Sequence, residues 1–125
     1  MWKRYIIEFG WGADLHGQDV TKAAKKAVKD AISKICLSGL KEIIGIEDLN
    51  EGVRLEIMIA SPDPEQVDQE EVLSVIPFGK TDLKVKEGGM RVPGIFVREF
   101  DDQDDSIVIC NAAITVYVDV RTNSV

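Results

Sequence analysis

The sequence has few of the residues on which most metal and redox sites depend. Its 125 residues include one histidine and two cysteines. The cysteines, Cys36 and Cys110, lack the CxxC spacing of thiolate metal sites. Both lie in apolar stretches, so we expect two buried, reduced thiols.

A long apolar run and a basic run are also absent. No stretch reaches the roughly 20 apolar residues of a membrane-spanning helix. The first ten residues, MWKRYIIEFG, lack the apolar stretch and small-residue cleavage site of a signal peptide. The net charge is −7, from 22 acidic and 15 basic residues, whereas nucleic-acid affinity comes mostly from neutralising phosphates. We therefore expect a cytoplasmic protein that binds neither nucleic acid nor membranes.

What is present fits one globular α+β domain. Hydrophobic residues make up 45% and charged residues 30% of a chain long enough for one core. Alternation of period two predicts strands, and apolar residues at helical spacing predict helices. Asp19 is the expected N-cap of the long helix, and Asp68 and Glu71 have capping-box spacing at the short one. The predicted elements are a strand at 4–9, a long helix at 19–37, a helical turn at 40–44, a strand at 53–60, a short helix at 68–76, a strand at 80–86, a segment at 90–92 that pairs back on that strand after a double-glycine turn, a loop at 96–105 and a final strand at 107–120.

The final strand is the longest and most apolar of these elements. One of its faces is apolar throughout, and Ile107, Ile109 and Ala113 make the first half of the other face apolar too. A strand that is apolar on both faces needs cover on both sides. One long and one short helix are too little to cover a mixed or antiparallel sheet of about four strands twice. We therefore expect a homo-oligomer that assembles through sheet packing.

A glycine-rich segment at residues 10–17 is the most distinctive stretch, and we expect it to be a loop between the first strand and the long helix. It contains the only histidine and three of the ten glycines, Gly10, Gly12 and Gly17. Such glycines allow positive φ angles or the close approach of another group. The segment lacks the third glycine of a dinucleotide fingerprint and the GK[ST] of a P-loop.

Asp14 and His16 lie in this segment two residues apart, so in extended backbone their side chains leave on one side. Three interpretations are open. The pair binds a divalent metal in an open site, or it transfers protons beside the N-terminus of the long helix, which would hold an anionic group. In the third interpretation Asp14 caps a turn and His16 forms a hydrogen bond within the core.

Other candidate ligand-binding residues lie further along the chain. Lys22 at the helix start and Arg91 beside a double glycine are the best cations for an anionic substrate. Asn111 in the final strand is expected to be a buried polar residue that either contributes to the site or forms a hydrogen bond to a loop. The acidic run at 101–105 lacks the glycine and closing glutamate of an EF-hand, so we expect a solvated loop there without calcium.

The N-terminal segment YIIEFGWGADLHGQDVTKAA, the helix start DVTKAAKKAVKDAI and the later EGGMRVP and CNAA resemble one protein family of bacteria and plants. That uncharacterised, conserved hypothetical family is defined by an N-terminal GxGxDxHG motif, which is complete here. The resemblance covers nearly the whole chain and implies no particular activity.

A shorter resemblance suggests a metal. The spacing of Gly10, Gly12, Asp14 and His16 resembles the first strand of 2-C-methyl-erythritol cyclodiphosphate synthases, over seven residues. In that family the matching Asp and His bind zinc in a homotrimer, together with a further histidine. The resemblance implies a zinc site in which Cys, Asp, Glu or a neighbouring subunit supplies the remaining ligand.

A third resemblance concerns architecture. The order of predicted elements is similar to that of Bacillus-type chorismate mutases, with Ser61-Pro62-Asp63 and Gly88-Gly89 at corresponding places. It implies a related chorismate-mutase-like trimer, as an analogy of fold alone.

Together these features predict a homo-oligomer, with a trimer favoured. A small-molecule site, for an anionic metabolite or a divalent metal such as zinc, is expected at the glycine segment near a subunit boundary. The competing hypothesis is a non-catalytic structural or regulatory module in which the segment only shapes the interface. Whether the protein is an enzyme is open between them.

Overall fold

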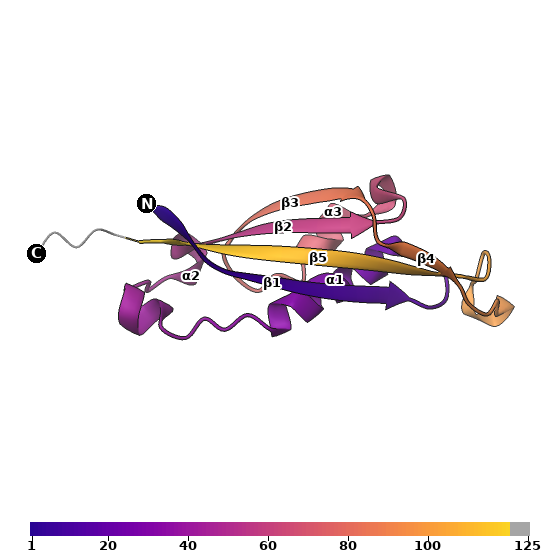
Figure 1. Ribbon diagram of the computed structural model, residues 1–125, viewed down its shortest axis with the longest axis horizontal. Coiled ribbons are helices and arrows are strands. Elements are labelled where there is room, and N and C mark those ends of the chain that lie inside the picture. The colour runs from indigo at the N-terminus through magenta and orange to yellow at the C-terminus, as the bar shows by residue number, and fades with distance from the viewer. Residues whose placement is uncertain (121–125) are drawn as a thin grey trace, which may run out of the picture.

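A five-stranded mixed sheet forms the body of the computed structural model, which describes residues 1–120 (Figure 1). The strand order is β1 (Trp2–Asp14), β5 (Ser106–Asp119), β2 (Val53–Ser61) and β3 (Lys80–Glu87), and β4 (Met90–Pro93) also pairs with β5. β2 and β3 are parallel, and the other pairs are antiparallel. The predicted α+β class is confirmed. The sheet, predicted to be mixed or antiparallel with about four strands, is mixed and has five strands.

β5 is the centre of this sheet. One edge of β5 pairs with β1 from Trp2 to Asp14. The other edge pairs first with β4 over residues 106–109 and then with β2 over residues 111–118. The prediction that residues 90–92 pair back on the preceding strand is wrong. They pair with β5, because Gly89, at φ +67°, turns the chain out of β3 and into line with β2.

The long helix α1 (Val20–Ser33) packs on β1, β5 and β2 through a stripe of small residues. Ala23, Ala27 and Ala31 are fully buried at four-residue spacing. Asp19 caps the helix as predicted, accepting from the Thr21 and Lys22 amides at 3.0 and 3.2 Å. The helix ends at Ser33 and not at Leu37, because the Lys34 and Ile35 amides bond to carbonyls three residues back and tighten the last turn.

The remaining helical elements are short. α3 (Gln69–Leu73) contacts α1 and is shorter than the predicted helix at 68–76, although Asp68 caps it by accepting from the Glu71 amide at 3.2 Å. The predicted turn at 40–44 is a π-helical turn, and three further short elements were not predicted. In chain order these elements are η1 (Leu40–Ile44), α2 (Leu49–Gly52), η2 (Pro64–Gln66), α3 (Gln69–Leu73) and η3 (Arg98–Phe100).

α1 and α3 lie on the same side of the sheet, behind it in Figure 1, and the opposite face is open. On this open face the side chains of Ile7, Phe9, Trp11 and Met58 are 38%, 64%, 61% and 46% exposed. Cover by another subunit stays a prediction. Within residues 1–120, no helix is both long and apolar enough to cross a membrane.

The two cysteines differ. Cys110 is buried in the core as predicted, and burial raises the pKa of its thiol. Cys36 is exposed, so the expectation of a buried thiol is wrong there. It follows α1 at the surface, where its sulfur lies 3.2 Å from the Ser38 hydroxyl.

Candidate functional site

The glycine segment at 10–17, predicted to be a loop, consists of the end of strand β1 and a turn. Gly10 and Gly12 belong to β1, and only residues after Asp14 leave the strand. A Cβ on Gly10 would lie 2.3 Å from the Ala27 carbonyl oxygen, and one on Gly12 would lie 2.5 Å from that of Ala23. Gly10 and Gly12 therefore allow α1 to approach β1 closely. Gly17 has a different role, because its backbone has a positive φ of +90°.

The turn from β1 into α1 is closed by Asp14. Its carboxylate is almost buried, at 7% exposure, and accepts from the Asp19 amide at 2.8 Å. The turn passes through Gly17 and Gln18, both at positive φ. This geometry matches the interpretation in which Asp14 caps a turn.

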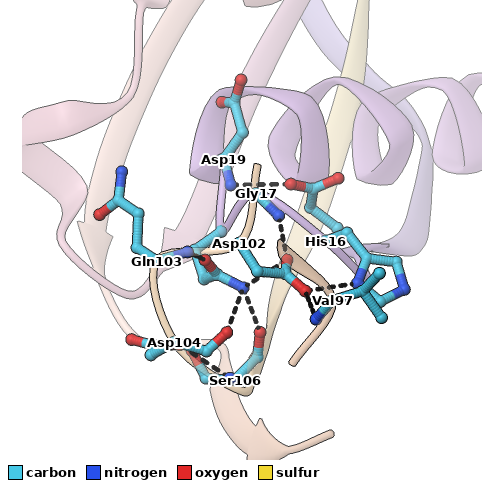
Figure 2. A network of polar contacts seen from close by, with 10 residues as sticks. His16, Gly17, Asp19, Val97, Asp102, Gln103, Asp104 and Ser106 are labelled. Atoms are coloured by element: carbon cyan, nitrogen blue, oxygen red, sulfur yellow. Dashed lines mark hydrogen bonds and ion pairs between the residues drawn. The ribbon is translucent and has the colours of Figure 1, made fainter. Parts of the chain in front are cut away.

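His16 does not share a partner with Asp14. Its Nδ1 lies 2.7 Å from Oδ2 of Asp102, in the connection between β4 and β5 (Figure 2). The Asp102 carboxylate also accepts from the amides of Gly17 and Val97, both at 2.7 Å. The expectation that residues 101–105 form a solvated loop is therefore wrong for Asp102, whose side chain is 0% exposed.

Four donors hold Asp102 in its ionised form. The fourth is Gln18 Nε2, at 3.2 Å. Burial is the largest single influence and acts to raise the pKa of the Asp102 carboxyl. The hydrogen bonds together outweigh burial, with that from His16 the largest, and hold the pKa well below its usual range.

The imidazole of His16 is oriented by this contact and still reaches solvent. Its side chain is 32% exposed. With Nδ1 directed at an ionised carboxylate, the neutral ring carries its proton on Nδ1 and presents the Nε2 lone pair. Phe100 packs against the ring edge, with centroids 4.9 Å apart.

Gln18 connects the same turn to the start of β5. Its Nε2 donates to the Ser106 carbonyl at 2.8 Å, and its Oε1 accepts from the Gln103 amide at 2.8 Å. In Figure 2 the labelled acceptor and donor residues of these bonds, Ser106 and Gln103, lie close to Asp102 in the 97–106 connection. Neither Gln18 nor Asp102 was predicted, and no local pattern marks either one.

The other predicted ligand-binding residues are Lys22, Arg91 and Asn111, and within residues 1–120 none of them forms a hydrogen bond or ion pair with His16. Lys22 is exposed on the first turn of α1. Arg91 forms an ion pair with Asp63 and donates to the Ser106 hydroxyl at 3.3 Å. Asn111 is exposed on the open face opposite Trp11, so the expectation that it is buried is wrong for the single chain.

No predicted metal site is complete in the described chain. Across residues 1–120, no three His, Cys, Asp or Glu side chains are grouped so that they could hold a metal ion. Asp14 and His16 point to separate partners, the Asp19 amide and the Asp102 carboxylate. The metal interpretation would therefore need ligands from a neighbouring subunit.

The comparisons with known proteins agree with the first resemblance. A family model described as "Conserved hypothetical protein (Lin0512_fam)" matches residues 4–116. The chain belongs to this family. Its fold is similar to the crystal structure of an FtsZ-like protein of unknown function from Nostoc punctiforme PCC 73102, with 45% identity and a TM-score of 0.84. That match covers 94% of this chain and 97% of the Nostoc chain, whereas a search of curated proteins gave no significant match.

Proposed function

We propose that this chain provides an acid–base site for a small molecule, in which His16 transfers the proton and Asp102 positions His16. The observation that carries the proposal is the 2.7 Å contact between His16 Nδ1 and a fully buried Asp102 carboxylate. The proposal keeps the interpretation in which His16 transfers protons, and it replaces Asp14 by Asp102 as the acidic partner.

The chemistry follows from the environments of the two groups. Asp102 is fixed by four donors, so it cannot turn away when the imidazole gains a proton. An ionised carboxylate at this distance stabilises the imidazolium formed when Nε2 accepts a proton. A substrate would approach Nε2 from the exposed side of the ring, beside Phe100.

Anion capture by the N-terminus of α1 fits less well. Asp19 already accepts from the first amides of the helix, and Asp14 accepts from the Asp19 amide. A bound metabolite would therefore rely on side chains, and not on the helix amides, for its polar contacts. An anionic substrate whose proton is abstracted at Nε2 fits this arrangement.

The proposal includes a homo-oligomer, with a chorismate-mutase-like trimer as first choice. The exposed apolar side chains of the open sheet face support it, because large exposed apolar surfaces usually mark interfaces with another molecule. In an oligomer, a second copy would also enclose His16, whose side chain is accessible to solvent in the single chain. The alternative, a non-catalytic assembly module, is favoured by one observation: the bonds from His16, Gly17 and Gln18 to Asp102 also fasten the 97–106 connection to the β1–α1 turn.

The experiment has a structural and a binding readout. In ¹⁵N NMR, the single histidine is expected to carry its neutral-state proton on Nδ1, and Asp102→Asn is expected to shift this tautomer balance towards Nε2. A thermal-shift screen with phosphorylated and carboxylated metabolites is expected to find a ligand that stabilises the native protein and not His16→Gln.

Leu15→Ala is the matched control for the screen, because Leu15 is an exposed neighbour with an apolar side chain. It should respond to the ligand as the native protein does. A histidine with its proton on Nε2, or a ligand that stabilises His16→Gln equally well, would sink the acid–base proposal. The module hypothesis would then be preferred.

A further inference from the structure

The outer edge of β1 is met by side chains of α1. β1 pairs with β5 on one edge, and on the other edge three of its backbone groups bond to the helix. Lys34 Nζ donates to the Phe9 carbonyl at 2.8 Å, and Lys26 Nζ donates to the Ala13 carbonyl at 3.0 Å. Between them, the Trp11 amide donates to Asp30 Oδ2 at 3.1 Å.

The three side chains form one row because the helix and the strand advance at matching rates. Lys26, Asp30 and Lys34 are four residues apart and lie on one side of α1. Four helical residues advance about 6 Å, and two strand residues advance about 6.6–6.8 Å. Each advance of four residues along the helix therefore brings one side chain of the row opposite the next strand residue whose backbone groups point outward. Lys26 and Lys34 donate to the strand, and Asp30 between them accepts from it.

Gly10 and Gly12 make this contact possible. They lie between the three strand residues, and their missing side chains let the α1 backbone come within a distance that no Cβ would allow. A Cβ on Gly12 would lie 2.5 Å from Lys26 Cβ itself. The glycine pair and the row are thus parts of one arrangement, which explains the spacing of these glycines without a ligand.

The charged side chains of the row interact with each other as well as with the backbone of β1. Asp30 and Lys34 form an ion pair at 3.3 Å. The hydrogen bond from the Trp11 amide is the first cause, and the one from Lys34 the second, that lowers the pKa of the Asp30 carboxyl. Asp30 is therefore held ionised as the acceptor in the middle of the edge.

We propose that the Lys26–Asp30–Lys34 row is an autoinhibitory contact that closes the β1 edge against strand addition by a second copy of this chain. An unprotected edge is a template for pairing, and inserted lysines are a known means of blocking it. β1 suits self-pairing, since Ile7, Phe9 and Trp11 leave its open face apolar and exposed. Antiparallel pairing of two β1 edges would be symmetric, with each strand donating to the other. Because the β1 edge is closed, assembly is directed to the open sheet face. This inference does not depend on the His16 site.

The test removes the row and follows both association and the edge itself. The variant Lys26→Ala/Asp30→Ala/Lys34→Ala loses two positive charges and one negative charge, and the control Lys29→Ala on the exposed side of α1 makes the same net change. Sedimentation velocity over a concentration series is expected to show species beyond the native assembly for the row variant alone. If the row variant and Lys29→Ala both sediment as the native protein does, the proposal is overturned.

A milder variant keeps the test decisive if the triple variant does not fold. Asp30→Asn preserves the shape of the side chain and removes its charge. Because the acceptor of this bond becomes neutral and the bond weakens, the Trp11 amide is expected to exchange with solvent about tenfold faster in monomeric conditions. Equal exchange of the Trp11 amide in Asp30→Asn and the native protein would overturn the proposal, whereas faster exchange confined to the β1 edge would support it.

Discussion

Replacing Gly10 by alanine tests whether the glycines serve helix packing. The new Cβ would lie 2.3 Å from the Ala27 carbonyl oxygen and 2.4 Å from the Ala31 amide nitrogen. Both atoms are backbone, so no side chain can rotate away. α1 would have to retreat by about 1 Å before these contacts became ordinary van der Waals contacts.

The cost follows from what that retreat would disturb. Overpacking a core usually costs about 1–3 kcal/mol. Gly10 is not at positive φ, so alanine would recover about 0.4–1 kcal/mol by restricting the unfolded chain. We expect the upper part of the overpacking range, because Ala27 and Ala31 are fully buried and a shift of α1 loosens its contact with three strands. The net loss should be about 2 kcal/mol.

Urea unfolding followed by circular dichroism measures this loss, with Gly45→Ala as the control. Gly45 has nothing within 4 Å of its missing Cβ, but its φ is +86°. It should therefore show only the cost of a left-handed backbone, about 1 kcal/mol. A Gly10→Ala protein within about 0.5 kcal/mol of the native stability would refute the packing argument.

Three further predictions follow from the site and the open face. The depressed pKa of Asp102 stabilises the fold above the unfolded value of about 3.9 and stops doing so as pH falls through the folded value. Acid unfolding should thus begin as pH drops below about 4, and Asp102→Asn should have a shallower pH dependence in urea titrations, with Asp30 and Asp104 supplying the remainder. Asp14→Ala removes the acceptor that closes the β1–α1 turn and should cost about 1 kcal/mol in the same assay, and an unchanged midpoint would show that the turn does not need it. Light scattering should give a mass above that of the 13.9 kDa chain, Trp11→Glu should reduce it to the monomer, and a monomeric native protein would disprove assembly through the open face.

Local periodicity was enough to predict the elements with strong patterns. The buried faces of β2 and β5 alternate strictly, and α1 has its small residues at helical spacing. The short elements α2, η2 and η3 were missed because three or four residues carry no usable period. The end of α1 was misplaced because the apolar Ile35 and Leu37 continue the helical pattern as partly buried residues beyond the last turn.

The candidate site was harder to predict, because its partners are distant in sequence. His16 was identified as the only histidine, but its partner Asp102 lies 86 residues away in a run of acidic residues typical of a solvated loop. The buried charge of Asp102 is compensated by donors from Gly17, Gln18 and Val97. Gly17 and Gln18 are distant in sequence from Val97, and the pairing of β1 with β5 brings these donors together. Asn111 was misassigned for a related reason, since the residues beside it are apolar whether or not a partner covers them.

The central position of β5 has a consequence for how the chain folds during synthesis. β1, β2 and β4 all pair with β5, which follows them in the chain, and β1 is separated from it by about a hundred residues. While the chain emerges from the ribosome, β2 and β3 can pair with each other, but β1 has no strand partner until residues 106–119 are made. Contacts of such long separation make folding slow and leave unpaired strands exposed. β1 can meanwhile dock on α1, which is synthesised directly after it, so the helix would act as a temporary partner for the strand until β5 arrives.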